Sequence, residues 1–157
     1  CDATNPEAVA KVYALKQRIE SKALICLVAD DRMLSKYIKQ IPEVALDIIE
    51  VAENPTTIVY DEPQNLAENL IGSDNTIAIR IPDDDFCFQL LRQFNGAIVS
   101  TSANISGQPS PKSFSEISDE ILKGVDYVVN SQFEKKSTKP SSIIKLTNSG
   151  LVTIIRK

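Results

Sequence analysis

The residues best suited to chemistry lie in the stretch Ile98 to Pro111, which reads IVSTSANISGQPSP. An apolar run stops there, and five hydroxyl or amide residues follow within seven positions: Ser100, Thr101, Ser102, Asn104 and Ser106. A buried strand that ends in such a loop offers hydroxyls, an amide and backbone N–H groups at one rim of a sheet. These groups can hold a polar ligand. The same residue types also cap local backbone in ordinary turns, so composition alone leaves both interpretations open.

A second group of candidates is cationic and lies near the start of the chain. The tripeptide Asn5-Pro6-Glu7 predicts the beginning of a helix that runs to about Arg18. Lys16 continues the apolar stripe of that helix, so it either snorkels to solvent or reaches into a site, and snorkelling is commoner. Arg18 points elsewhere on a regular helix. Both cations could face one ligand only if the helix unwinds near Gln17.

Composition bounds the kinds of protein that this chain can be. It has 157 residues, 43% hydrophobic and 24% charged, which is typical of one ordinary domain. No apolar run approaches a membrane span, so we expect no membrane partner. Cys26 and Cys87 sit among apolar neighbours and indicate reduced core thiols in a cytoplasmic protein. The absence of histidine excludes histidine-based catalysis and histidine metal ligands within these residues. A net charge of −4 argues against a general nucleic-acid coat.

Helical and strand patterns alternate along the chain, which predicts an α/β (α+β) fold with a twisted mixed sheet and flanking helices. The predicted strands are residues 23–29, 58–60, 76–81, 97–99, 127–129 and 151–155. The predicted helices, besides the first, are residues 31–38, 42–51, 66–71, 85–95 and 113–124, the last opened by a capping box at Ser113 and Glu116. The acidic triplet at 83–85 is better explained as a helix cap than as a metal site, and we expect no protein-bound metal. Asn148 to Gly150 predicts a hairpin turn.

The loop S-T-S-A-N-I-S-G at residues 100–107 resembles the T-S-A-N-x-S-G signature of the YrdC/YciO family, the threonylcarbamoyl-AMP synthases. Further motifs of that family follow in order. Residues 14–18 resemble its K-x-R motif, residues 80–82 its V-R-x-P element, and residues 140–145 its P-S-T-V-V-D segment. Thr57 stands where the family's P-G-P-x-T turn ends, and Arg156 resembles the arginine of its I-I-R ending. The resemblance covers nearly the whole chain and implies a YrdC-like fold with a central concave groove.

The chain also departs from the family pattern. Ile19 and Ala23 stand where the family has prolines, Asn54 replaces a glycine, and Lys145 replaces an aspartate. The family opens with a strand and a P-T-[ED]-T-x-Y-G-L-G-like segment that would lie upstream of Cys1. We therefore expect residues 1–157 to be a single YrdC-like domain that lacks this N-terminal strand and first motif, and to turn over poorly on their own.

The resemblance implies an enzyme that condenses L-threonine, bicarbonate and ATP into threonylcarbamoyl-AMP for the t6A modification of tRNA, a nucleotidyltransferase reaction. Lys16 and Arg18 would clamp the ATP phosphates, with Mg²⁺ bridging them. Threonine or carbamate would lie against Arg80, expected beside Thr101 at the sheet rim, and against Thr101 and Ser142. The nucleotide would be held by Ser100, Asn104 and the backbone near Ala103. Further ligand contacts are expected from Thr57, Ser141 and Arg156.

Two other functions stay open at this stage. The same fold could present a groove to double-stranded RNA or tRNA, for which the basic loop with Lys135, Lys136 and Lys139 is the only support. A YciO-like paralogue could use another acyl or carbamoyl substrate, and the four departures from the family pattern support it. In the synthase reading, the product passes to downstream tRNA-modifying proteins.

Overall fold

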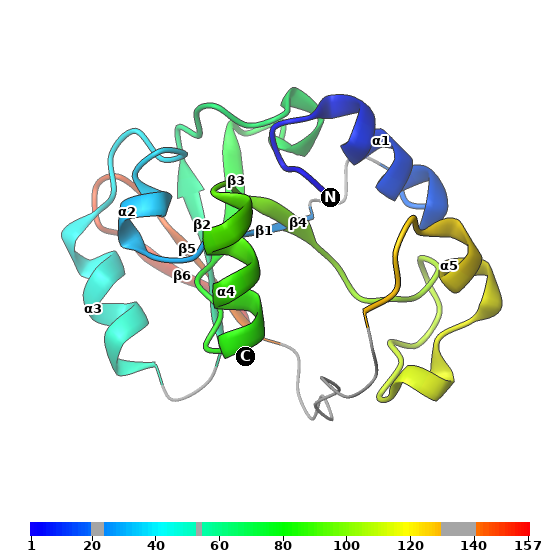
Figure 1. Ribbon diagram of the computed structural model, residues 1–157. Helices are drawn as coiled ribbons and strands as arrows, with labels where there is room; N and C mark the ends of the chain where they lie inside the picture. The colour runs from blue at the N-terminus through cyan, green and yellow to red at the C-terminus, as the bar shows by residue number, and fades with distance from the viewer. Residues whose placement is uncertain (20–23, 53–54, 130–140) are drawn as a thin grey trace.

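The computed structural model describes residues 1–19, 24–52, 55–129 and 141–157 (Figure 1). The helices in these ranges are α1 (Pro6–Leu15), α2 (Asp31–Leu34), α3 (Glu43–Val51), α4 (Asp85–Phe94) and α5 (Asp119–Gly124), with 3-10 turns η1 (Glu68–Leu70) and η2 (Phe114–Glu116). The strands are β1 (Ile25–Leu27), β2 (Thr56–Asp61), β3 (Thr76–Arg80), β4 (Ile98–Ser100), β5 (Ser142–Leu146) and β6 (Val152–Arg156).

The strands form one mixed sheet in the order β4-β1-β3-β2-β5-β6. Two neighbouring pairs, β1 with β3 and β2 with β5, are parallel, and the other three pairs are antiparallel. In Figure 1, α1 and α5 lie at the right of the view and α2 and α3 at the left, with α4 in front of the sheet. The predicted mixed sheet with packed helices is confirmed.

The two faces of the sheet differ in chemistry. Because paired residues share a face and side chains alternate along a strand, the register assigns each residue to one side. One face, the core face, is apolar and buried on β1 to β5. Its residues are Val99, Cys26, Ile79, Ile77, Ile58, Tyr60, Ile144 and Leu146. The opposite face also carries apolar residues, among them Leu27, Ala78 and Val59. It is called the polar face below because Ser100, Arg80 and Thr57 lie on it, together with Arg156, which pairs with Ile143 next to a bulge. Candidate site residues from four different strands therefore share one side of the sheet.

Local cap signals formed as expected. Asn5 caps α1 by accepting from the N–H groups of Glu7 and Ala8. Asp84 caps α4 through Cys87 N–H, so the acidic triplet does serve as a helix start. Asn148 to Gly150 lies in the turn between the antiparallel strands β5 and β6, with Gly150 at φ +84°. Such a left-handed position favours glycine.

Other predicted elements are shorter than expected or did not form. The helix predicted over 31–38 is a four-residue turn, and that over 66–71 is the 3-10 turn η1. The capping box at Ser113 is wrong: the Glu116 carboxylate accepts instead from Lys112 N–H, and α5 begins only at Asp119. The strand predicted at 127–129 is also wrong, since the structure assigns no strand there, these residues pair with no strand of the described ranges, and Tyr127 is 79% exposed.

Candidate functional site

The end of α1 positions the two predicted cations. The helix stops at Leu15, earlier than predicted, because Gln17 adopts the left-handed conformation with φ +48°. Gln17 N–H donates to Ala14 O and Arg18 N–H to Tyr13 O, both at 3.0 Å. This pair of bonds is the Schellman arrangement that ends many helices, here with glutamine where glycine is usual. The chain therefore turns between Lys16 and Arg18, which meets the condition for both to serve one site.

Lys16 is buried, only 3% exposed, and its ammonium reaches the serine-rich loop. Its Nζ donates to the carbonyl oxygens of Ser102 at 2.5 Å and Asn104 at 2.7 Å. Burial lowers the pKa of Lys16, and the nearby charge of Arg18 lowers it further. The snorkelling interpretation of Lys16 is thus wrong, because its ammonium is buried and bonded to the loop.

The loop over residues 100–108, called the serine loop below, is held by its own backbone and by α1. Ser106 N–H donates to Lys16 O at 2.8 Å, and Ile105 is buried at 6% exposure. The Asn104 amide nitrogen donates to Ile105 O and Gln108 O, whereas Asn104 Oδ1 is buried without a hydrogen-bond partner. A buried acceptor without a donor is rare and lowers the stability of the folded protein, and a ligand that donates a hydrogen bond to it would remove this cost.

The predicted nucleotide-contacting residues differ in exposure along this loop. Ser100 is half-buried at the end of β4 with its side chain on the polar face, and Ala103 is also half-buried. Thr101 and Ser102 are exposed and open to solvent. The role of Ser102, whose carbonyl accepts from Lys16, was not among the predicted contacts, because a sequence shows side chains and not the direction of backbone carbonyls.

A second cluster gathers on the polar face where β2, β5 and β6 meet. Thr57 is fully buried, and its hydroxyl bonds the hydroxyl of buried Ser141 at 2.9 Å. Arg156 donates from Nε and a terminal nitrogen to Ser141 O at 3.0 and 2.6 Å. Ser142 instead bonds the Thr56 hydroxyl at 3.1 Å, and the strand alternation places both on the opposite side of the sheet. The structure therefore joins Thr57, Ser141 and Arg156 and leaves Ser142 apart.

Arg80 lies at the end of β3, level with Thr57 when the β2–β3 register is continued by one pair. Its Nε is buried and has no hydrogen-bond partner. Burial lowers its pKa, Cys87 acts in the opposite direction, and the charge of Arg156 lowers it further. The register places Arg80, Thr57, Ile143 and Arg156 in one row across the polar face, and no ion pair joins either guanidinium to a carboxylate among the residues that the structure describes.

The predicted proximity of Arg80 to Thr101 is wrong. β1 lies between β3 and β4, and β4 runs antiparallel to it. Arg80 is level with Leu27 and Ile98, whereas Ser100, next to Thr101, is level with Ile25 at the other end of the strands. The candidate site therefore consists of two clusters on one side of the molecule, one at the serine loop and one around Arg80.

Lys145, which replaces the family's aspartate, serves a structural ion pair. Its Nζ lies 2.8 Å from Asp74 Oδ2, which raises the pKa of Lys145 and lowers that of Asp74. Ala23, Asn54 and the basic loop with Lys135, Lys136 and Lys139 lie outside the described residues, so the predictions that depend on them stay predictions.

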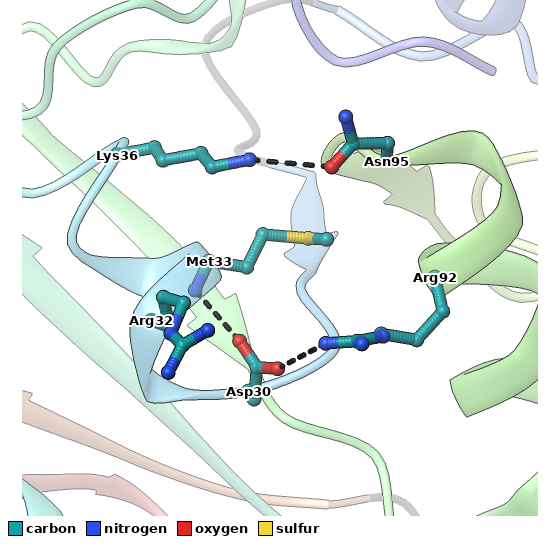
Figure 2. A pocket seen from close by; sticks show the side chains of 6 residues that line it. All are labelled: Asp30, Arg32, Met33, Lys36, Arg92 and Asn95. Carbon is teal, nitrogen blue, oxygen red and sulfur yellow. Dashed lines mark hydrogen bonds and ion pairs between the residues drawn. The ribbon is translucent and has the colours of Figure 1, made fainter.

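A separate pocket of about 260 Å³ lies between α2 and α4 (Figure 2). Its wall is lined by Asp30, Arg32, Met33, Lys36, Arg92 and Asn95. Arg92 pairs with Asp30 at 3.3 Å, and Lys36 Nζ donates to Asn95 Oδ1 at 3.4 Å. Because these groups pair with one another and none was predicted to bind a ligand, the pocket does not coincide with the candidate site.

The described residues contain no cluster of three or more acidic, cysteine or histidine side chains that could hold a metal ion. No helix in the described ranges is long and apolar enough to cross a membrane. What the site offers is cations, hydroxyls and backbone groups, which suit the binding of phosphates, carboxylates and a nucleoside.

Comparisons with known proteins agree with this chemistry. The family model for Sua5, YciO and YrdC proteins, described as telomere recombination, matches residues 1–157. A Methanocaldococcus jannaschii protein provisionally named threonylcarbamoyl-AMP synthase is 36% identical over 155 residues, 98% of this chain and 71% of that one. The threonylcarbamoyl-AMP synthase of Photobacterium profundum is 35% identical over 124 residues, 77% of this chain and 67% of that one.

Solved structures show the same fold. P. abyssi Sua5 complexed with L-threonine superimposes with a TM-score of 0.81 at 25% identity, covering 93% of this chain. The chain spans only 43% of that longer protein. E. coli YciO superimposes with a TM-score of 0.81 at 21% identity, covering all of this chain and 76% of that one.

Proposed function

This chain belongs to the Sua5/YciO/YrdC family, and we propose that it acts as a threonylcarbamoyl-AMP synthase on L-threonine, bicarbonate and ATP. The observation that supports this most is the pair of guanidinium groups on the polar face. The strand register places Arg80 and Arg156 in one row across the polar face, and neither has a carboxylate partner among the described residues. Like charges gathered without a counter-ion favour an anionic ligand, such as the carboxylate of an amino acid or a carbamate.

The proposed reaction requires no protein nucleophile. The amine of threonine adds to CO₂ derived from bicarbonate and loses a proton to give a carbamate. A carbamate oxygen then attacks the α-phosphorus of ATP, and the bond to the β-phosphate breaks with pyrophosphate as the leaving group. The protein must hold the reactants in line and neutralise the charge on the phosphates. A site built from arginine, lysine, serine and threonine, in a chain without histidine, meets these requirements.

The two clusters would bind different substrates, ATP at the serine loop and threonine or carbamate on the polar face. At the serine loop, Arg18 would contact the ATP phosphates next to the charge of Lys16, and Ser100, Asn104 and the backbone near Ala103 would hold the nucleoside. Asn104 Oδ1, buried without a donor, is the acceptor that a ligand N–H or hydroxyl would satisfy. On the polar face, Arg80 and Arg156 would hold threonine or carbamate, with Thr57 and Ser141 fixing Arg156. Thr101, exposed on the serine loop, would contact the reacting end.

Mg²⁺ fits this site only as an ion carried by ATP. The described residues provide no acidic cluster for it, but Mg²⁺ commonly keeps several waters and binds mainly through substrate phosphates. When bound, it would neutralise phosphate charge. The threonylcarbamoyl group would pass on to tRNA through downstream modifying proteins.

A YciO-like activity on another acyl or carbamoyl substrate is the second candidate. The specific observation for it is Lys145, which replaces an acid of the family pattern and is paired with Asp74. The region around Arg80 would keep its preference for anions, and the identity of the amine substrate would change. The double-stranded RNA-binding alternative depends on the basic loop outside the described residues, so the structure adds nothing to it.

Pyrophosphate release tests the proposal against both alternatives. The protein is incubated with ATP and Mg²⁺, with threonine and bicarbonate present together, singly or not at all. A synthase releases pyrophosphate only when both are present. Release that is indifferent to threonine would support the paralogue, and salt-dependent binding of double-stranded RNA without any turnover would support the binding module.

A further inference from the structure

Lys16 both donates hydrogen bonds to the serine loop and accepts one from it. Its side chain donates to two loop carbonyls, Ser102 O and Asn104 O, while its own carbonyl accepts from Ser106 N–H. These three bonds cross from the last turn of α1 to a segment more than eighty residues away in sequence. An ammonium group has three N–H donors, so two of them are used in holding the loop.

Lys16 and Arg18 differ in how far their side chains are exposed. Lys16 is 3% exposed, whereas Arg18 is half-buried on the far side of the left-handed turn at Gln17. A buried lysine is costly unless its charge is hydrogen-bonded, and the loop carbonyls provide that compensation. A ligand phosphate would have to displace these carbonyls to take the same donors. The three bonds between Lys16 and the loop do not involve Arg18.

We propose that Lys16 is a positioning residue that fastens the serine loop to the end of α1, and that the direct contact of this pair of cations with phosphate comes from Arg18. Lys16 thereby fixes Asn104, whose carbonyl it holds and whose side-chain Oδ1 faces the buried space without a partner. The loop then presents its groups to a nucleoside in a fixed geometry. This goes beyond the family resemblance, which implies that both cations of the K-x-R motif clamp phosphates.

The first test needs no ligand and so does not depend on the proposed function. Hydrogen exchange is measured at the backbone amides of Asn104 and Ser106 in the wild type and in Lys16→Met. We expect both amides to exchange at least about tenfold faster in the variant, the scale of one lost hydrogen bond to a charged group. The β3 amide of Ile79 serves as the internal reference and keeps its rate.

Lys11→Met is the matched control, since it removes the same charge from an exposed position on α1. It should leave the loop amides at wild-type rates. Lys16→Gln, which is polar but too short to reach both carbonyls, is the second variant and should behave as Lys16→Met does. Wild-type exchange at Asn104 and Ser106 in these Lys16 variants would overturn the proposal.

The second test rests on the proposed function and separates anchoring from phosphate contact. Adenosine carries no phosphate, so a residue that only clamps phosphates cannot affect its affinity. We expect calorimetric titration to show at least about tenfold weaker binding of both adenosine and ATP to Lys16→Met. Arg18→Met should bind adenosine as the wild type does and ATP more weakly.

Unchanged adenosine affinity with weakened ATP affinity in Lys16→Met would make Lys16 a phosphate contact and refute the anchoring role. A wild type that binds neither compound would contradict the proposed function instead. The exchange measurement on the loop would still decide the role of Lys16 in that case.

Discussion

Replacing Arg80 by methionine should make the ligand-free protein more stable and the site less able to bind. Arg80 carries a buried Nε without a hydrogen-bond partner among the described residues, and its burial lowers its pKa. Methionine keeps an unbranched stem of similar shape and removes the charge. The folded state then no longer bears an unsatisfied donor, while a ligand carboxylate or carbamate loses its counter-ion.

The size of both effects follows from the environment of Arg80. A buried polar group without a partner costs about 1–3 kcal/mol, and because Arg80 is only partly buried we expect a gain of about 1 kcal/mol in the free energy of unfolding. For a domain of this length that corresponds to a melting temperature about 2–4 °C higher. The loss of a hydrogen bond to a charged group costs about 1.5–3 kcal/mol, so threonine affinity should fall roughly ten-fold to a hundred-fold.

Thermal melting without ligand and calorimetric titration with threonine measure the two effects on the same samples. Arg92→Met is the control, because Arg92 is largely exposed and pairs with Asp30 outside the candidate site. It should change neither affinity nor, by more than about 0.5 kcal/mol, stability. An Arg80→Met protein that melts earlier and binds threonine normally would show that Arg80 is a structural residue and that the polar face is not the site.

Three further substitutions test other parts of the account. Arg18→Ala should weaken ATP binding by about 1.5–3 kcal/mol and leave the melting temperature unchanged; normal ATP affinity would remove Arg18 from the site. Thr101→Val removes an exposed hydroxyl and should weaken threonine and ATP binding by about 1–3 kcal/mol with the fold intact. Unchanged titrations in a folded Thr101→Val protein would show that the serine loop is only a capped turn. Gln17→Gly should stabilise the protein by roughly 0.5 kcal/mol, because glycine adopts the left-handed conformation without strain. A lower melting temperature would mean that the bond from Gln17 to Glu120 outweighs that strain.

Features with local causes were predictable from the sequence. The caps at Asn5 and Asp84 and the turn at Gly150 each follow from a residue type that satisfies its own neighbouring backbone. The family motif in the serine loop was likewise contiguous. Gln17 shows the limit of such signals, since a left-handed glutamine is not a usual helix terminator, and the end of α1 was therefore predicted too late.

Features that depend on distant segments were not predictable. No local pattern shows that β1 separates β3 from β4, and so Arg80 was placed beside Thr101. The contact of Lys16 with the Ser102 and Asn104 carbonyls depends on the path of the serine loop, which the amino-acid types do not encode on their own. At 127–129 the apolar residues matched a strand, but a strand also needs a partner, and the described part of the chain provides none for them.

The most direct test of the central claim is to follow labelled carbon from substrate to product. The protein is incubated with ATP, Mg²⁺, bicarbonate and carbon-labelled threonine, and the adenylates are separated and identified by mass. The proposed function predicts a threonine-labelled adenylate that also incorporates label from bicarbonate and forms together with pyrophosphate. ATP cleavage that leaves all the threonine label in free threonine would contradict it.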